Sequence, residues 1–124
     1  ILDLDHFKAV NDTHGHDVGD QVLKAVANSL MDMTRYHDVV ARLGGEEFAV
    51  VAPNMDEVLL TKLAERIRKA IAGLVIVSGN VRLKVTTSVG LAVWDRHESP
   101  EGFYRRADKH LYEAKRLGRN RVCA

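Results

Sequence analysis

Apolar positions along the chain recur at two spacings, and each spacing predicts a different kind of element. A spacing of three to four residues predicts amphipathic helices that end near Met33, Ala72 and Leu117. Alternation of apolar and polar residues, or a short apolar run between turn residues, predicts strands. The predicted strands cover residues 1–5, 39–43, 48–52, 74–77, 81–93 and 121–123.

Three parts of this pattern make more specific predictions. The polar, glycine-containing segment from Thr13 to Asp17 predicts a loop, and no helix is expected before it. Alternation over residues 81–93 is the clearest strand signal and predicts one long strand. Ser99 before Pro100 predicts the start of the last helix. The inward face of that helix is expected to hold Tyr104, Ala107, Leu111 and Ala114.

The predicted order of elements is strand, helix, hairpin, helix, one or two strands, helix and a last edge strand. Such an order is typical of an α/β (α+β) domain with a ferredoxin-like sheet and helices on one or both faces. A chain of 124 residues without repeats or linkers predicts one domain with a single core.

Composition limits the kinds of partner and the cellular compartment that fit this domain. Apolar residues make up 46% and charged residues 28% of the chain, which are ordinary globular values. The net charge of +1 argues against a large nucleic-acid-binding surface. Because Cys123 is the single cysteine, no internal disulfide can form, and a reducing compartment is expected. No apolar run is long enough to span a bilayer. The chain opens on Ile1 inside a strand-like run, so we expect a fragment of a longer protein.

The predicted hairpin carries two glycines and two acids at its tip. Gly44 and Gly45 predict a tight turn, because glycine reaches positive φ without a steric penalty. Glu46 and Glu47 follow at once, and adjacent carboxylates repel each other unless a cation lies nearby. The tip is therefore either a solvated turn or a cation site.

The first strand offers a partner for these acids. Asp3 stands near its end, and Asp3 and Glu46 converge if the strand lies beside the hairpin. Mg²⁺ takes a few carboxylates and leaves positions for phosphate oxygens. The alternative, in which each acid is solvated separately, stays open at this point.

Cations and amides could supply the rest of a nucleotide site. Lys115 and Arg119 are four residues apart at the end of the last helix, where they would suit phosphate but also the helix dipole. Lys8 lies close to the acids. Asn11 and Asp20 together can satisfy the edge of a guanine, although Asp20 also suits the first turn of a helix.

These residues stand in an arrangement that resembles the GGDEF family of bacterial diguanylate cyclases, here in its GGEEF form. The resemblance covers residues 1–121. It is carried by Asp3-x-Asp5-x-Phe7-Lys8-x-x-Asn11-Asp12-x-x-Gly15-His16-x-x-Gly19-Asp20, by Gly44-Gly45-Glu46-Glu47-Phe48, and by Ala107-Asp108 with Leu111-Tyr112-x-Ala114-Lys115-x-x-Gly118-Arg119-Asn120.

The resemblance implies a fold and an activity. The fold would be nucleotidyl-cyclase-like, with a central, mostly antiparallel, five-stranded sheet flanked by helices. The reaction would join two GTP molecules into cyclic di-GMP and release two pyrophosphates. Each domain would bind one GTP, so a homodimer would be needed for catalysis. The domain would lie in the cytoplasm, bind no nucleic acid, and reach a membrane only through domains outside this sequence.

The resemblance also implies a role for each matching residue. Mg²⁺ or Mn²⁺, two ions per half-site, would be held by Asp3, the Leu4 carbonyl, Glu46 and Glu47. Catalysis would use Glu46, Glu47 and Lys8. Substrate would be bound by Asn11, His16, Asp20, Gly44, Gly45, Lys115 and Arg119. The two glycines would let a ribose or base approach the backbone closely.

A second motif matches the inhibitory site of the family. Arg35 and Asp38 form its Arg-x-x-Asp pair, and Arg66 stands at a position that often adds to it. An arginine fork can hold a phosphate or guanine bidentately. The same pair also arises as an ordinary salt bridge in a turn.

Three functions remain open on the sequence. Intact acids favour an active cyclase with product inhibition. A catalytically silent receptor for cyclic di-GMP would need only the Arg35 and Asp38 pair, and an interaction module would need neither site. The family's usual preceding helix and any sensor domain are absent from residues 1–124, so we expect regulation to lie outside this sequence.

Overall fold

The computed structural model describes residues 1–124 and has a mixed α/β architecture. Its elements are β1 (Leu2–Leu4), α1 (Phe7–His14), α2 (His16–Met33), β2 (Val39–Gly44), β3 (Glu47–Val51), α3 (Glu57–Gly73), β4 (Ile76–Ser78), β5 (Val81–Leu83), β6 (Thr87–Gly90), α4 (Pro100–Arg116) and β7 (Val122–Cys123).

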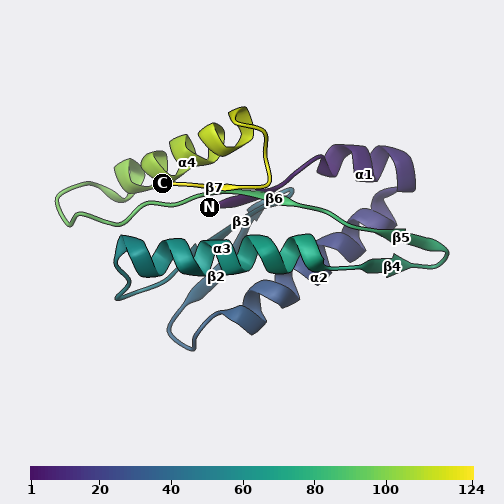
Figure 1. Ribbon diagram of the computed structural model, residues 1–124, viewed down its shortest axis with the longest axis horizontal. Helices are drawn as coiled ribbons and strands as arrows, with labels where there is room; N and C mark the ends of the chain where they lie inside the picture. The colour runs from purple at the N-terminus through teal and green to yellow at the C-terminus, as the bar shows by residue number, and fades with distance from the viewer.

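A five-stranded sheet forms the centre of the molecule, in the order β2-β3-β1-β6-β7. Its pairings are antiparallel except for β6 with β7, which run parallel. β4 and β5 form a separate two-stranded ribbon that extends beyond one end of the sheet (Figure 1). The predicted fold class, a mostly antiparallel five-stranded sheet flanked by helices, is confirmed.

Helices cover both faces of this sheet, with α2 and α3 on one face and α4 on the other (Figure 1). Leu2 and Leu4 of β1 belong to the core shared with α2 and α3. Because side chains alternate along a strand, Asp3 between them points to the α4 face. The other fully buried members of the core include Val22, Val26, Leu30 and Ile71.

The contact between α4 and the sheet depends on Gly90 of β6. A Cβ at this position would collide with the backbone of Ala107 and Leu111 in α4. The α4 backbone therefore lies directly on β6, with no side chain between them. This close packing fixes where the polar end of α4 meets β1.

The first wrong prediction concerns the segment after β1. No helix was expected before Thr13, whereas α1 occupies Phe7–His14. Phe7 is the one buried residue of this helix, so it has no repeating apolar stripe to reveal it. Gly15 ends α1 by donating its N–H to the Asn11 carbonyl at 2.8 Å.

The second wrong prediction is the single strand over residues 81–93. Its first part pairs with β4 as β5, and residues 87–90 pair with β1 as β6. β6 is buried on both faces, so the alternation of apolar and polar residues does not mark its limits. Its pairing with neighbouring strands sets them instead. Tyr104 is also exposed at 45% rather than inward-facing. The Ser99 cap is confirmed, because its hydroxyl accepts the Gly102 N–H at 3.1 Å.

None of the helices combines the length and the apolar character that a membrane crossing needs.

Candidate functional site

The hairpin between β2 and β3 has the tight glycine turn that the sequence predicts. Gly44 has φ 147° and Gly45 has φ 50°, so both lie in the region that favours glycine. A Cβ on either residue would meet open space, so backbone conformation is what requires glycine here. Arg42 closes the turn by donating its Nε–H to the Gly45 carbonyl at 2.9 Å.

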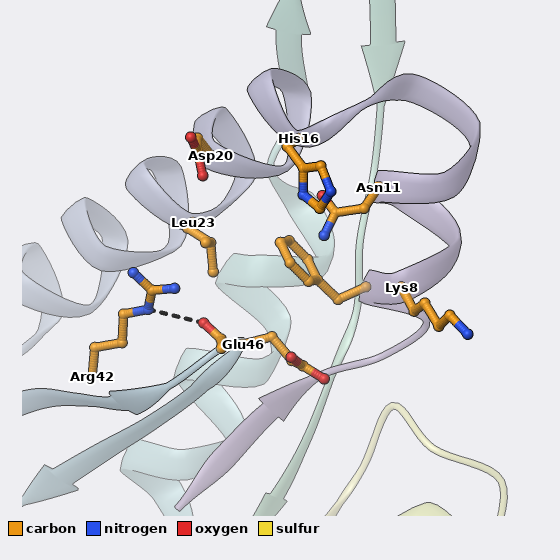
Figure 2. Close-up of a pocket in the computed structure, with 9 residues that line it drawn as sticks. Lys8, Asn11, His16, Asp20, Leu23, Arg42 and Glu46 are labelled. Carbon is orange, nitrogen blue, oxygen red and sulfur yellow. Dashed lines mark hydrogen bonds between the residues drawn. The ribbon is translucent and has the colours of Figure 1, made fainter.

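A cavity of about 350 Å³ lies between this turn and the first two helices (Figure 2). It gathers predicted site residues from α1, from α2 and from the hairpin. Its lining consists of Phe7, Lys8, Asn11, His16, Asp20, Leu23, Arg42, Gly45 and Glu46. Residues far apart in the sequence thus meet at one surface.

Apart from Arg42, which binds the Gly45 carbonyl, the polar side chains of this cavity make no hydrogen bond within the chain. Asn11 Oδ1 is buried and accepts no hydrogen bond, although a group of this kind normally finds one. The Asn11 side chain lies beside His16, whereas Lys8 extends away from both (Figure 2). None of the five ion pairs of the chain involves a charged residue of the cavity. The cavity therefore keeps unused capacity for hydrogen bonds to a ligand.

The three predicted acids lie close together on neighbouring strands. Asp3 of β1 pairs in register with Glu47 of β3, and the Leu4 N–H donates to the Glu46 carbonyl at 3.2 Å. Burial raises the pKa of Asp3; Lys115 opposes this shift, and the charges of Glu46 and Glu47 add to it. A cation bound at this place would relieve that concentration of negative charge.

The acids have side-chain partners on α4. Lys115 Nζ lies 3.1 Å from Asp3 Oδ2, and the Tyr104 hydroxyl donates to Glu47 Oε1 at 3.0 Å. No three His, Cys, Asp or Glu side chains are placed so that they could hold a metal ion together. The donors near Asp3 are carboxylates and backbone carbonyls, which fit Mg²⁺ or Mn²⁺. The assignment of ligands stays a prediction, and Lys115 provides the cation beside Asp3.

Helix α4 ends at Arg116, close to the predicted end at Leu117. Lys115 and Arg119 were expected to share a helical face, and this prediction is wrong because Arg119 lies beyond the helix. Gly118 donates its N–H to the Lys115 carbonyl at 3.3 Å, and Arg119 donates to the Ala114 carbonyl at 2.9 Å. This pair of bonds is a Schellman motif, which ends a helix at a residue with positive φ. Arg119 therefore lies in the turn after the helix, with φ 64°.

The Arg35 and Asp38 pair forms the salt bridge in a turn that was the alternative reading of the motif. Arg35 Nη2 lies 3.1 Å from Asp38 Oδ1 and donates to the Pro53 carbonyl at 2.8 Å. Burial favours the protonated form of Asp38, but hydrogen bonds from the side chain and backbone of Arg35 outweigh it and lower its pKa. Arg66 is exposed on α3. The arginine fork is thus already occupied.

Several residues of this region were not singled out as site residues from the sequence. Arg42 and Leu23 line the cavity, and Tyr104 holds Glu47. The place of Arg42 directly before the glycine turn was a signal that could have indicated a role in closing it. Tyr104 had no such signal, because the contact joins residues 57 positions apart.

Comparison with known proteins gives consistent matches. The family model described as "Diguanylate cyclase, GGDEF domain" matches residues 1–121. The probable diguanylate cyclase DgcT of Escherichia coli is 46% identical over 125 residues, covering 98% of this chain and 28% of that protein. The chain thus spans well under two thirds of this curated relative.

Solved structures agree with the sequence matches. The GGDEF domain of DgcB from Caulobacter crescentus, in complex with c-di-GMP, superimposes with a TM-score of 0.94 at 39% identity, covering 99% of this chain and 74% of that chain. The active GGEEF domain of a diguanylate cyclase from Vibrio cholerae gives a TM-score of 0.88 at 36% identity, covering 98% and 78%.

Fold and site together define a class of protein: an α/β domain that gathers carboxylates, amides and cations at one end of an antiparallel sheet, as a nucleotide-handling domain does. The chain belongs to the GGDEF family of diguanylate cyclase domains. This confirms the resemblance read from the sequence. The family is generally dependent on divalent metal ions.

Proposed function

We propose that this chain is the catalytic domain of a diguanylate cyclase, which condenses two GTP molecules into cyclic di-GMP and releases two pyrophosphates. One observation carries the proposal: the cavity joins Asn11, Asp20 and Glu46 at the glycine turn, and Asn11 Oδ1 is buried there without a partner. Relatives named as diguanylate cyclases and a relative solved with c-di-GMP support it.

The guanine base would occupy the end of the cavity formed by α1 and α2. The Asp20 carboxylate would accept the N1–H and the exocyclic amine of guanine, which adenine cannot offer in the same pattern. The buried Asn11 carboxamide would gain the hydrogen bond that it lacks. A buried polar atom without a partner costs about 1–3 kcal/mol, so binding would recover that free energy. His16 would flank the base.

The phosphates would lie toward β1 and the end of α4. Asp3, the Leu4 carbonyl, Glu46 and Glu47 would hold Mg²⁺ or Mn²⁺, and two ions per half-site would suit an in-line displacement. A bound cation lowers the pKa of a coordinated hydroxyl and stabilises phosphate charge. Lys8 would stabilise charge on the reacting phosphates, and Lys115 and Arg119 would bind the terminal phosphates.

Glu46 would accept the proton of the ribose 3′-hydroxyl. That hydroxyl ionises far above neutral pH, so it needs a base or a cation to become a nucleophile. The open space beside Gly44 and Gly45 would admit the ribose. Each domain would supply one GTP and one set of acids, so two copies would meet face to face, with the product formed between them.

Product inhibition would use the Arg35 and Asp38 turn, with Arg66 adding a third contact. Here cyclic di-GMP would have to take the Arg35 fork away from Asp38 and from the Pro53 carbonyl. A bidentate contact with phosphate or with a guanine edge would replace those bonds. We therefore expect inhibition to be weaker than the chemical complementarity of the motif alone implies.

The test is to incubate the protein with GTP and Mg²⁺ and to separate the products by chromatography. Cyclic di-GMP formed by the wild-type protein and lost in Glu46→Ala is the expected result. Tight cyclic di-GMP binding without any product, lost in Arg35→Ala, would instead identify a silent receptor. If the protein forms no product and binds no cyclic di-GMP, both functions are overturned.

A further inference from the structure

Asp5 is a buried carboxylate to which the proposed reaction assigns no role. Its residue is 5% exposed, and its two oxygens accept three hydrogen bonds. The donors are the Thr86 hydroxyl at 2.6 Å, the Ser88 hydroxyl at 2.6 Å and the Asn120 backbone N–H at 3.0 Å. A buried charge persists only when it is paired or fully hydrogen-bonded, and Asp5 meets that condition through two distant segments.

The segment that contains Asn120 has an unusual backbone. Gly118, Arg119 and Asn120 have φ values of 124°, 64° and 48°, so three successive residues have positive φ. Residues other than glycine rarely adopt this region, and each such residue costs of the order of 1 kcal/mol or more. A conformation of this kind persists only when surrounding contacts determine it.

Three contacts hold this turn in addition to the two bonds of the Schellman motif. Asp5 accepts the Asn120 N–H. Arg68 Nη1 donates to Asn120 Oδ1 at 2.9 Å. Arg121 Nε donates to the Arg119 carbonyl at 3.1 Å. Asp5 is the one buried anchor among them, and it directly follows β1, the strand that carries Asp3.

Asp3 and Asp5 therefore both contact the end of α4 and the turn that follows it. Asp3 contacts Lys115 in the last turn of α4, and Asp5 contacts Asn120 just beyond it. Arg119 stands between these two attachments. Its side chain is exposed and makes no ion pair, so the turn of the backbone is what fixes the point from which this side chain extends.

We propose that Asp5 is a positioning residue for phosphate binding: by holding the Asn120 N–H, it fixes the left-handed backbone at Arg119, just beyond the turn of α4 where Lys115 contacts Asp3. This inference rests on the proposed function, because it takes Arg119 to contact the terminal phosphates of GTP. Asp5 acts through Arg119 and touches no substrate.

Asp5→Asn tests the proposal, with two ligands compared by calorimetry. 3′-Deoxy-GTP carries all three phosphates but lacks the hydroxyl that would react, and GMP lacks the terminal phosphates. The neutral carboxamide weakens the hold on the Asn120 N–H. We expect the affinity for 3′-deoxy-GTP to fall about tenfold, as for one loosened charge-assisted contact, and that for GMP to change less than about twofold. Exchange of the Asn120 amide proton should accelerate.

Ser88→Ala is the matched control. It removes a hydroxyl from the same carboxylate but leaves the bond to Asn120 in place. It should lower the melting temperature without changing the ratio of the two affinities. Asn120→Pro removes the N–H that Asp5 accepts and cannot adopt the φ of 48°, without altering the buried carboxylate, so it should also weaken only 3′-deoxy-GTP. This second variant decides the matter if Asp5→Asn does not fold.

A double variant shows whether Asp5 acts through Arg119. In Arg119→Ala, the added Asp5→Asn change should weaken 3′-deoxy-GTP no further, because coupled residues are non-additive. Additive losses, or equal losses for GMP, would overturn the proposal and assign Asp5 to general stability. A wild-type protein that binds neither ligand would contradict the proposed function itself and remove the phosphate role with it. These outcomes are distinct.

Discussion

The cavity at the glycine turn and the Arg35 turn are the two polar clusters for which we propose nucleotide binding, yet they differ in how their groups are satisfied. In the cavity, Asn11 Oδ1 is buried without a partner. In the turn, Asp38 accepts from both the backbone and the side chain of Arg35. The first site is prepared for a ligand, and the second must first lose contacts of its own.

This difference has an energetic meaning. A ligand that satisfies Asn11 removes an existing penalty, so its hydrogen bond adds to affinity. A ligand that takes the Arg35 fork exchanges one set of bonds for another, so the net gain is small. Chemical type alone therefore does not rank two candidate sites, whereas the state of their hydrogen bonds does.

The largest expected effect tests the chemistry of the cavity. Glu46→Gln keeps the size of the side chain but removes the base and the charge, so cyclic di-GMP formation should fall about a hundredfold or more. Product chromatography over a time course measures it. Glu57→Gln, at an exposed glutamate that starts α3, is the control and should keep the wild-type rate. If the Glu46→Gln protein formed cyclic di-GMP at the wild-type rate, the cavity would not be the catalytic site that we contrast with the Arg35 turn.

A smaller effect sharpens the role of the unpaired carboxamide. In Gly19→Ala the new Cβ would collide with Asn11 Oδ1 and press on Phe7. The displaced Asn11 should weaken 3′-deoxy-GTP about tenfold, as for one lost hydrogen bond to the base. Alanine gains about 1 kcal/mol over glycine in a helix, which offsets the steric strain. Calorimetry measures the affinity for 3′-deoxy-GTP, and a thermal melt measures the stability of the variant. Unchanged affinity would show that Asn11 does not read the base.

A third prediction concerns product inhibition at the turn. Arg35→Ala removes the fork that cyclic di-GMP would take, so product should accumulate roughly linearly for longer than in the wild type. The loss of stability should be about 1–3 kcal/mol, because the change leaves the Asp38 carboxylate, whose side chain is 1% exposed, without its cationic partner. Progress curves at high GTP measure the effect. Arg35→Lys keeps the charge without the fork, so a Lys variant that is still inhibited would show that charge alone suffices.

The smallest effect is a dependence of stability on pH. The pKa of Asp38 is lowered in the folded state. The ionised Asp38 therefore stabilises the fold at pH values above its unfolded pKa of about 3.9, and this stabilisation is lost as the pH falls through its lower folded pKa. Asp38→Asn should remove this part of the acid sensitivity. Denaturant melts of both proteins between about pH 5 and pH 2 would reveal it. Parallel curves would show that the turn adds no pH-dependent stability.

Much of the fold was predictable because its elements carry strong local patterns. The stripes of α2 and α3 and the glycine turn of the hairpin each follow from a few adjacent residues. The break after Leu83 was not predictable in this way. β6 is chosen by its pairing with β1, more than eighty residues earlier in the chain, and local alternation contains no sign of that choice.

The same distinction holds for the site. The motif spacing shared with the family predicted that Asn11, Asp20 and Glu46 belong to one site, and all three line one cavity. The contacts of the acids with α4 were missed, because Tyr104 and Glu47 are distant in sequence. Helix α4 ends at Arg116, within one residue of the predicted end at Leu117. The predicted helical face shared by Lys115 and Arg119 was wrong, because Arg119 lies in the turn after Gly118, where Asn120 is bound to the distant Asp5.

The central place of β1 also decides how this protein folds. β1 is synthesised before both of the strands with which it pairs, β3 and β6, and the bond from Asn120 to Asp5 closes a loop of 115 residues. High contact order of this kind slows folding. During translation, the nascent chain must therefore keep an apolar strand unpaired until most of the domain has left the ribosome, and this is the interval in which chaperones would be needed.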